Sequence, residues 1–256
     1  MTSVAKNKSA LKKRVVRFFH SPKRSELKQL TSDLSKIGEV IAFGGVIRDI
    51  ALYGAKNFNS DIDLVVNCSS ESLAIFFQLS HKNFEKNKFG GYRTATKSWT
   101  VDVWPLEKTW AFENNKVEFI GRESLLRTTI TNWDAIAYSF KDGAILCQND
   151  YFHIIKIGEI DLVLECNPNN AGVLLRTLRS IFDGRANKIM PKALSYLKKE
   201  LRQRTCGEIY TLQQKMFGKE FFTEGDIEQL RQQINVLDEN LFGSEVHPKG
   251  TVKNLF

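Results

Sequence analysis

The chain has 256 residues, of which 42% are hydrophobic and 26% charged, so it carries enough apolar side chains for a folded core. No apolar run approaches the roughly 18 residues of a membrane span, and the basic N-terminus lacks the apolar core of a secretory signal. The four cysteines lie far apart, which excludes the spacing of a zinc site or a disulfide framework. We therefore expect a cytoplasmic protein with no membrane partner.

Positive charge is concentrated in two parts of the sequence. The net charge is +8 and the isoelectric point is about 9.2. The first basic group lies within residues 6–24 and the second within residues 188–204. Such a balance suits a partner with a phosphate backbone, and a surface of solvated lysines is the alternative interpretation.

Helices and strands are expected to alternate in the first half of the chain. Residues 24–37 have the apolar spacing of an amphipathic helix and close a basic N-terminal helical segment, 1–37. The elements expected after it are, in chain order, a strand over 39–43, a helix over 46–53, a strand over 61–66, a helix over 70–79, and strands over 91–96 and 99–104. This alternation indicates an α+β fold with a mixed sheet, which we assign to residues 38–122.

From residue 123 onward the pattern becomes mainly helical. We expect one domain over 123–243 and a tail over 244–256. Within that domain the expected elements are a helix over 132–140, short strands or loops over 142–164, and helices over 171–182, 190–204, 207–217 and 224–238.

Two acidic residues alternate along the strand expected at 61–66. Side chains two apart on a strand share a face, so Asp61 and Asp63 project to one side while Ile62 and Leu64 face the core. Carboxylates that close repel each other unless cations or protons neutralise them. Mg²⁺ meets that need, because it prefers a few carboxylates together with phosphates and water.

A third carboxylate, Asp102, lies on the strand expected at 99–104. Val101 and Val103 point to one face of that strand and Asp102 to the other, where an acidic residue is costly without a partner. Asp61, Asp63 and Asp102 together could form a catalytic site for two Mg²⁺ ions. The alternative for Asp61 and Asp63 is a solvated pair in a loop. Arg93, on the preceding strand, could reach a bound triphosphate, or could be an ordinary exposed arginine.

Gly44 and Gly45 separate an expected strand from an expected helix. Glycines at such a junction let the backbone approach a phosphate closely, with helix amides facing it. A Gly-Gly pair alone is usually a simple turn. The succession of strand, Gly-Gly, helix and Asp-x-Asp strand is far more specific.

The segment FGGVIRDIALYGAKNFNSDIDLVV resembles the head-domain signature of class II tRNA CCA-adding enzymes and bacterial poly(A) polymerases, members of the polymerase-β-like nucleotidyltransferase superfamily. The resemblance implies that Asp61 and Asp63 bind metal, that Asp102 takes the third acidic position, and that Gly44 and Gly45 hold the triphosphate. It adds Arg48 and Asp49, which would bind phosphate or brace the loop; a surface ion pair is the alternative.

Two later segments resemble the same family more weakly. Residues 127–140 end like its N-A-L-A-Y segment, which adds Asp134 to the nucleotide-binding set, and residues 170–182 match its E-D-x-x-R-x-x-R helix at Arg176 and Arg179. An ordinary charged helix face is the alternative for these two arginines. The departures from the motifs are Thr128, Thr129 and Ile130 in place of R-R-D, and Gly172 and Val173 in place of E-D. The choice of nucleotide is therefore left open.

The resemblance implies an enzyme that uses Mg²⁺ to transfer a nucleotide from an NTP, such as ATP, to an acceptor hydroxyl. An RNA 3′ end, that of tRNA first, is the expected acceptor. Another nucleotide, a small molecule or a protein is the alternative acceptor, with a possible toxin or defence role. A catalytically inactive RNA-binding module is the alternative from a different class.

Overall fold

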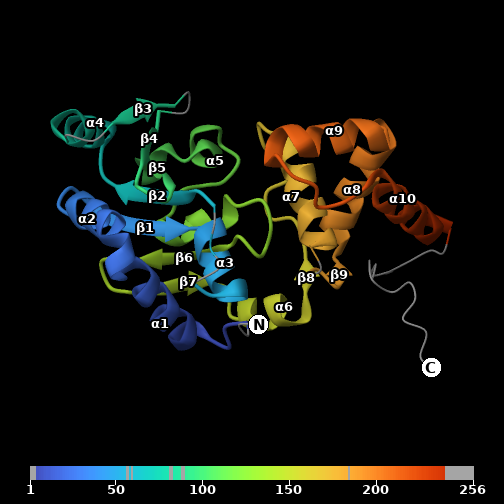
Figure 1. Cartoon of the computed structure of the whole chain (residues 1–256), viewed down its shortest axis with the longest axis horizontal. Coiled ribbons are helices and arrows are strands. Elements are labelled where there is room, and N and C mark those ends of the chain that lie inside the picture. The colour runs from blue at the N-terminus through green and yellow to red at the C-terminus, as the bar shows by residue number, and fades with distance from the viewer. Residues whose placement is uncertain are drawn as a thin grey trace. The chain divides into compact units, whose positions relative to one another are not determined.

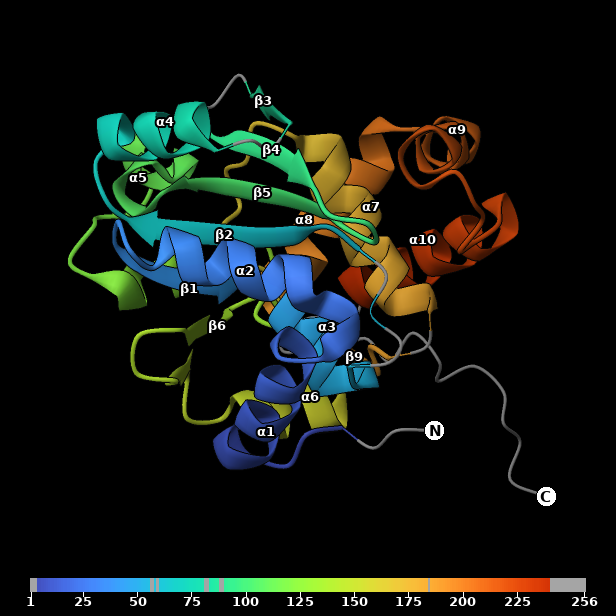
Figure 2. The same ribbon diagram turned by 60° about the vertical axis from the view of Figure 1, so that its left-hand side comes forward.

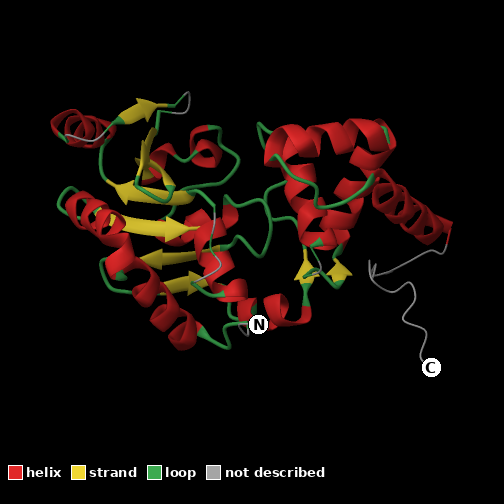
Figure 3. Cartoon of the chain, viewed as in Figure 1, coloured by secondary structure: helices red, strands yellow, loops and turns green. Residues whose placement is uncertain are grey.

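The computed structural model describes residues 4–55, 58, 60–80, 83–87, 90–183 and 185–239. The chain forms two compact units, shown in Figure 1. The first combines Met1–Thr129 with Trp133–Phe152, and the second combines Ile130–Asn132 with His153–Phe256. A sheet with helices makes up the first unit, and helices dominate the second (Figure 3).

Within the described residues, the first unit contains a seven-stranded mixed sheet with the strand order β3-β4-β5-β2-β1-β6-β7. Its strands are β1 (Glu39–Phe43), β2 (Ile62–Asn67), β3 (Phe84–Lys86), β4 (Tyr92–Ala95), β5 (Thr100–Pro105), β6 (Ile136–Ser139) and β7 (Ile145–Cys147). The pairing of β2 with β5 is parallel and the other pairings in this sheet are antiparallel.

Helices cover both faces of this sheet. They are α1 (Lys8–Phe19), α2 (Ser25–Leu34), α3 (Gly45–Tyr53), α4 (Ser70–Leu79) and α5 (Trp110–Glu113), with 3₁₀ turns η1 (Pro22–Arg24), η2 (Leu106–Lys108) and η3 (Arg122–Arg127). Helices α2 and α3 pack on the strands near β1, and α4 packs on β5 (Figure 2). Asn7 and Ser69 cap α1 and α4 by accepting a backbone amide of the first turn.

Alternation along the central strands separates an apolar face from the face that carries the acidic residues. On β2 and β5, Ile62, Leu64, Val101 and Val103 are fully buried. The opposite face carries Asp63 and Asp102 and leads into a second apolar cluster, whose buried members are Ile41, Val65, Leu106, Phe112, Leu125 and Ala137. Both faces of the strand centres are thus fixed by packing.

Aromatic packing holds α1 in the first unit. The buried Phe18 ring meets Phe19 and Phe58 edge-on, with centroids 5.1 and 5.3 Å away. The guanidinium of Arg24 lies 4.2 Å from the Phe18 centroid and 4.9 Å from that of Trp99. The N-terminal segment therefore belongs to the core of this unit.

In its described residues, the second unit is built mainly from four helices. Its elements are the C-terminal part of α6 (Tyr151–Ile157), β8 (Glu159–Ile160), α7 (Asn170–Phe182), β9 (Lys188–Ile189), α8 (Pro191–Gln203), α9 (Cys206–Phe217) and α10 (Glu224–Glu239), and β8 pairs with β9 in parallel. Buried leucine, isoleucine and valine side chains of α7 to α10 form its core. Thr205 and Glu208 form a capping box at the start of α9.

The observed elements confirm the expected α+β fold with a helical part, and differ from the expectation in several places. The helix expected over 132–140 is wrong: Ile136–Ser139 is strand β6, buried along its whole length between β1 and β7. A fully buried strand shows no alternation, so its apolar run fitted a helical period equally well. Strand β3 was not expected, and the short strands or loops expected over 142–164 include a helix, α6 (Tyr151–Ile157). Residues 123–152 supply β6 and β7 to the sheet, whereas the tail expected over 244–256 lies outside the described residues.

Among the helices of the described residues, none is long and apolar enough to cross a membrane.

Replacing Phe18 by alanine should lower the free energy of unfolding of the first unit by about 3–5 kcal/mol, because it leaves a cavity among packed rings. All four tryptophans, Trp99, Trp104, Trp110 and Trp133, belong to this unit, so urea unfolding followed by tryptophan fluorescence reports on it selectively. Leu79→Ala is the control, because Leu79 is 75% exposed and its loss should change the value by less than about 0.5 kcal/mol. Equal effects of the two substitutions would contradict this packing.

Candidate active site

Strand order and direction bring the glycine pair and the acidic residues to one end of the sheet. Strand β1 runs antiparallel to β2 with Ala42 opposite Leu64, so Gly44, just after β1, lies near the start of β2. Strand β5 runs parallel to β2 with Asp63 opposite Asp102, so both strands begin at that same end. Residues far apart in sequence thus form one candidate site.

The junction between β1 and α3 has the geometry that the glycine pair predicts. Gly44 is the N-cap of α3 and has a φ of +67°, a conformation that strongly favours glycine. A Cβ atom built there meets no atom within 4 Å, so conformation rather than crowding requires the glycine. Because the first amides of a helix have no acceptor inside the helix, the start of α3 suits an anion.

The three carboxylates differ in exposure. The Asp61 side chain, just before β2, is 56% exposed, whereas that of Asp102 is 14% exposed. Asp63 is partly buried at the start of β2. Asp102 lies next to Asp63 in the strand register, on the same face of the sheet. Carboxylates placed in this way need positive charge nearby.

Arg93 on β4 supplies positive charge to this group. Its Nε donates to Oδ1 of Asp102 at 2.8 Å and its Nη2 donates to Oδ2 at 2.7 Å. The same Nη2 lies 3.8 Å from Oδ2 of Asp61. The hydrogen bonds and the charge of Asp102 raise the pKa of Arg93, and the charges of Asp61 and Asp63 raise it further. Sequence alone did not find this pair, since it depends on the register between β4 and β5.

The donor set fits a hard divalent cation. Asp61, Asp63 and Asp102 offer only carboxylate oxygens, which Mg²⁺ prefers over nitrogen or sulfur. As the side chains stand in the described part of the chain, no three acidic, histidine or cysteine residues are grouped closely enough to hold an ion. Asp102 instead directs both of its oxygens toward Arg93.

Arg48 and Asp134 contact each other directly. Arg48, on α3, donates through Nη1 to Asp134 and through Nε to Asp49 at 2.8 Å. Burial acts to lower the pKa of Arg48, but the charges of Asp134 and Asp49 outweigh it and the pKa is raised. Nearby, the buried Tyr151 hydroxyl donates to the Trp133 carbonyl at 2.8 Å. The bond between Arg48 and Asp134 braces α3 against the segment before β6; a nucleotide contact for Arg48 or Asp134 stays a prediction.

Arg176 and Arg179 lie on α7 in the second unit. Arg176 is exposed. Arg179 is partly buried, and its guanidinium lies 4.3 Å from the ring centroid of Phe221 and 5.5 Å from that of Phe217. Their contribution to a nucleotide site stays a prediction.

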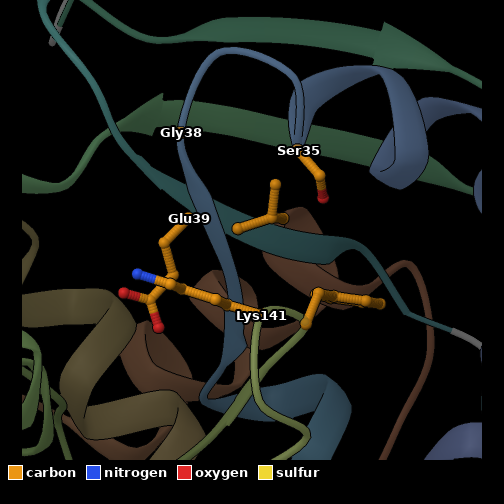
Figure 4. A pocket seen from close by; sticks show the side chains of 6 residues that line it. Ser35, Gly38, Glu39 and Lys141 are labelled. Carbon is orange, nitrogen blue, oxygen red and sulfur yellow. The ribbon is translucent and has the colours of Figure 1, made fainter.

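A shallow hollow near the start of β1 lies apart from this candidate site. It is lined by Ser35, Gly38, Glu39, Val40, Phe140 and Lys141 (Figure 4). Glu39 begins β1, whereas Gly44 follows its last residue, so the hollow is at the opposite end of the strand. The carboxylate of Glu39 accepts from Arg122 at 2.5 Å and from Ser139 at 2.6 Å, which gives it a bracing role there.

No family model and no curated protein matches this sequence, but solved structures match its fold. A CCA-adding enzyme in complex with CTP is 18% identical with a TM-score of 0.57, and the match covers 91% of this chain and 63% of that one. The Thermotoga maritima CCA-adding enzyme complexed with tRNA is 18% identical with a TM-score of 0.56, covering 95% and 64%.

A tRNA nucleotidyltransferase complexed with a primer tRNA and an incoming ATP analogue is 20% identical with a TM-score of 0.54, covering 86% of this chain and 64% of that one. The chain therefore has the fold of the CCA-adding enzymes, as the sequence resemblance predicted. It spans a little under two thirds of the length of these structures.

Asp134→Ala should lower the free energy of unfolding of the first unit by about 2–4 kcal/mol, because it leaves the partly buried Arg48 guanidinium with one partner fewer. Urea unfolding followed by tryptophan fluorescence measures the change. Lys36→Ala removes the exposed pair with Asp33 and should cost less than about 0.5 kcal/mol. A loss as small for Asp134→Ala would show that the pair does not brace α3.

Proposed function

We propose that this chain is an Mg²⁺-dependent nucleotidyltransferase that transfers NMP from an NTP to the 3′-hydroxyl of an RNA, with tRNA as the first candidate. The observation that carries the proposal is the convergence of Asp63, Asp102 and the Gly44–Gly45 helix start at one end of the sheet. The fold shared with CCA-adding enzymes supports it.

In the proposed reaction, the 3′-oxygen of the acceptor bonds to the α-phosphorus as the bond from that phosphorus to the leaving pyrophosphate breaks, and the hydroxyl proton passes to water. Asp61, Asp63 and Asp102 would hold Mg²⁺, which supplies neutralisation of phosphate charge and a lower pKa for the acceptor hydroxyl. The amides at the start of α3 would take the triphosphate beside Gly44 and Gly45.

An RNA acceptor is favoured by charge as well as by fold. Solved structures of the same fold contain tRNA or a primer tRNA. Helix α1 carries five basic residues and no acidic one, and Lys8, Lys12, Lys13 and Arg17 are exposed on it. A stretch of positive charge of this kind attracts a phosphate backbone in a salt-dependent manner.

Selection of the base would fall to α7. Solved relatives in fold contain CTP or ATP. In this chain Gly172 and Val173 stand where the family resemblance would place acidic side chains, and both are buried in the helix packing. Arg176 and Arg179 remain to contact the base or the phosphates. We therefore propose a base preference that differs from, or is looser than, that of a site with the acidic pair.

The proposed chemistry is tested by incubating the purified chain with Mg²⁺, each α-³²P-labelled NTP in turn, and tRNA or total RNA. Asp63→Asn should lower label incorporation roughly 1,000-fold, equivalent to about 4 kcal/mol of transition-state stabilisation. Glu107→Gln, which removes an exposed carboxylate from η2, should leave incorporation unchanged.

Incorporation that Asp63→Asn does not reduce would contradict the proposed role of this residue. Label that enters a small molecule or a protein instead of RNA would keep the chemistry and replace the acceptor. The absence of transfer to any acceptor, together with the absence of Mg²⁺-dependent NTP binding, would leave an RNA-binding module.

Arg176→Ala should raise the KM for the NTP about tenfold with little change in kcat, because an exposed arginine that only binds the nucleotide contributes equally to the ground and transition states. Steady-state kinetics with the preferred NTP measures both constants. Lys192→Ala removes one exposed positive charge from α8 in the same unit and should leave KM unchanged. Equal effects of the two variants would exclude a specific role for Arg176.

A further inference from the structure

Four charged residues form one row across the sheet. Glu85 on β3 pairs in register with Arg93 on β4, Arg93 pairs with Asp102 on β5, and Asp102 pairs with Asp63 on β2. Residues paired directly across neighbouring strands share a face of the sheet. The guanidinium of Arg93 is therefore set by the strand register among carboxylates.

The bond between Arg93 and Asp102 occupies both oxygens of the carboxylate. The two nitrogens of the guanidinium lie 2.8 and 2.7 Å from the two oxygens, which is the paired geometry of the strongest ion pairs between side chains. Asp102 is only 14% exposed, so little water competes for it. A divalent cation that requires Asp102 must weaken this bond and must approach a fixed positive charge.

We propose that Arg93 is a resident counter-cation that competes with the divalent metal for Asp102, so that metal and nucleotide bind cooperatively. The proposal rests on the proposed function, because it takes Asp102 as a metal ligand. Without nucleotide, Arg93 neutralises part of the charge of the three carboxylates and lowers their affinity for metal. The triphosphate offers the guanidinium another anion of matching geometry and frees Asp102.

The position of Arg93 suits such an exchange. Its side chain is 51% exposed, so the guanidinium can change partners without unpacking the core. Asp61, which lies 3.8 Å from the same nitrogen, gives it a second carboxylate at the opening of the site. Arg48, which has a structural role, is by contrast only 23% exposed and is bonded to both Asp49 and Asp134.

Titration of the whole chain with Mn²⁺ alone, followed by the electron paramagnetic resonance signal of the free ion, tests the competition directly. Arg93→Ala should bind Mn²⁺ about tenfold more tightly than the unmodified chain. Arg93→Lys, which keeps the charge but loses the paired geometry, should fall between the two. Lys86→Ala removes one positive charge from β3, on the face opposite Arg93, and should not change the affinity.

A double-mutant cycle separates competition from a general effect of charge. In an Asp102→Asn background, Arg93→Ala should no longer tighten Mn²⁺ binding, because the carboxylate for which the two cations compete is gone. Adding a non-hydrolysable NTP analogue should tighten Mn²⁺ binding to the unmodified chain more than to Arg93→Ala. Far-UV circular dichroism checks that each variant is folded.

The proposal is overturned if Arg93→Ala binds Mn²⁺ no more tightly than the unmodified chain, or if the gain persists in the Asp102→Asn background. It is also overturned if neither protein binds Mn²⁺. A failure of the proposed function gives a different result, because the Mn²⁺ titrations need no acceptor: the competition is then observed, but no nucleotide is transferred to RNA.

Discussion

The parallel pairing of β2 with β5 sets Asp63 directly opposite Asp102, with Ile62 opposite Val101 and Leu64 opposite Val103. Like charges at such a separation repel, whereas the apolar pairs on the other face are fully buried and hold the two strands in register. A slip of one residue would bury the carboxylates and expose the apolar side chains. Packing on one face of the sheet therefore imposes a concentration of negative charge on the other.

The surroundings of the site follow from that imposed charge. Arg93 on β4 places a positive charge beside these carboxylates, and the glycine junction presents the first amides of α3 near them. Arg48, which follows the glycine pair in sequence, also carries a positive charge. That charge is paired with Asp49 and Asp134 rather than with the three carboxylates of the site. The two arginines thus have separate tasks: one is partly exposed among the acidic residues, and the other is partly buried and ties α3 to the segment that leads into β6.

Much of this could be predicted from local sequence, and the rest depends on spatial pairing. The spacing of the apolar residues predicted β1, β2, β5 and α4, because each of these elements has one buried face or a short buried run. Strand β6 was misassigned since burial on both faces removes the alternation. The contact of Arg48 with Asp134 spans 86 residues, and that of Arg93 with Asp102 depends on strand register. The position of either arginine in the sequence therefore does not indicate which residue it contacts.

The packing of α1 also determines when the first unit can be completed during synthesis. Phe18 packs near Trp99, and Phe19 meets the Phe140 ring edge-on at 4.9 Å. Helix α1 therefore has no complete binding surface until residue 140 has been made, and β1 lacks one neighbour until β6 follows. These contacts between distant parts of the sequence slow the folding of the sheet. Until these contacts form, the aromatic side chains of α1 stay exposed and available for binding by a chaperone.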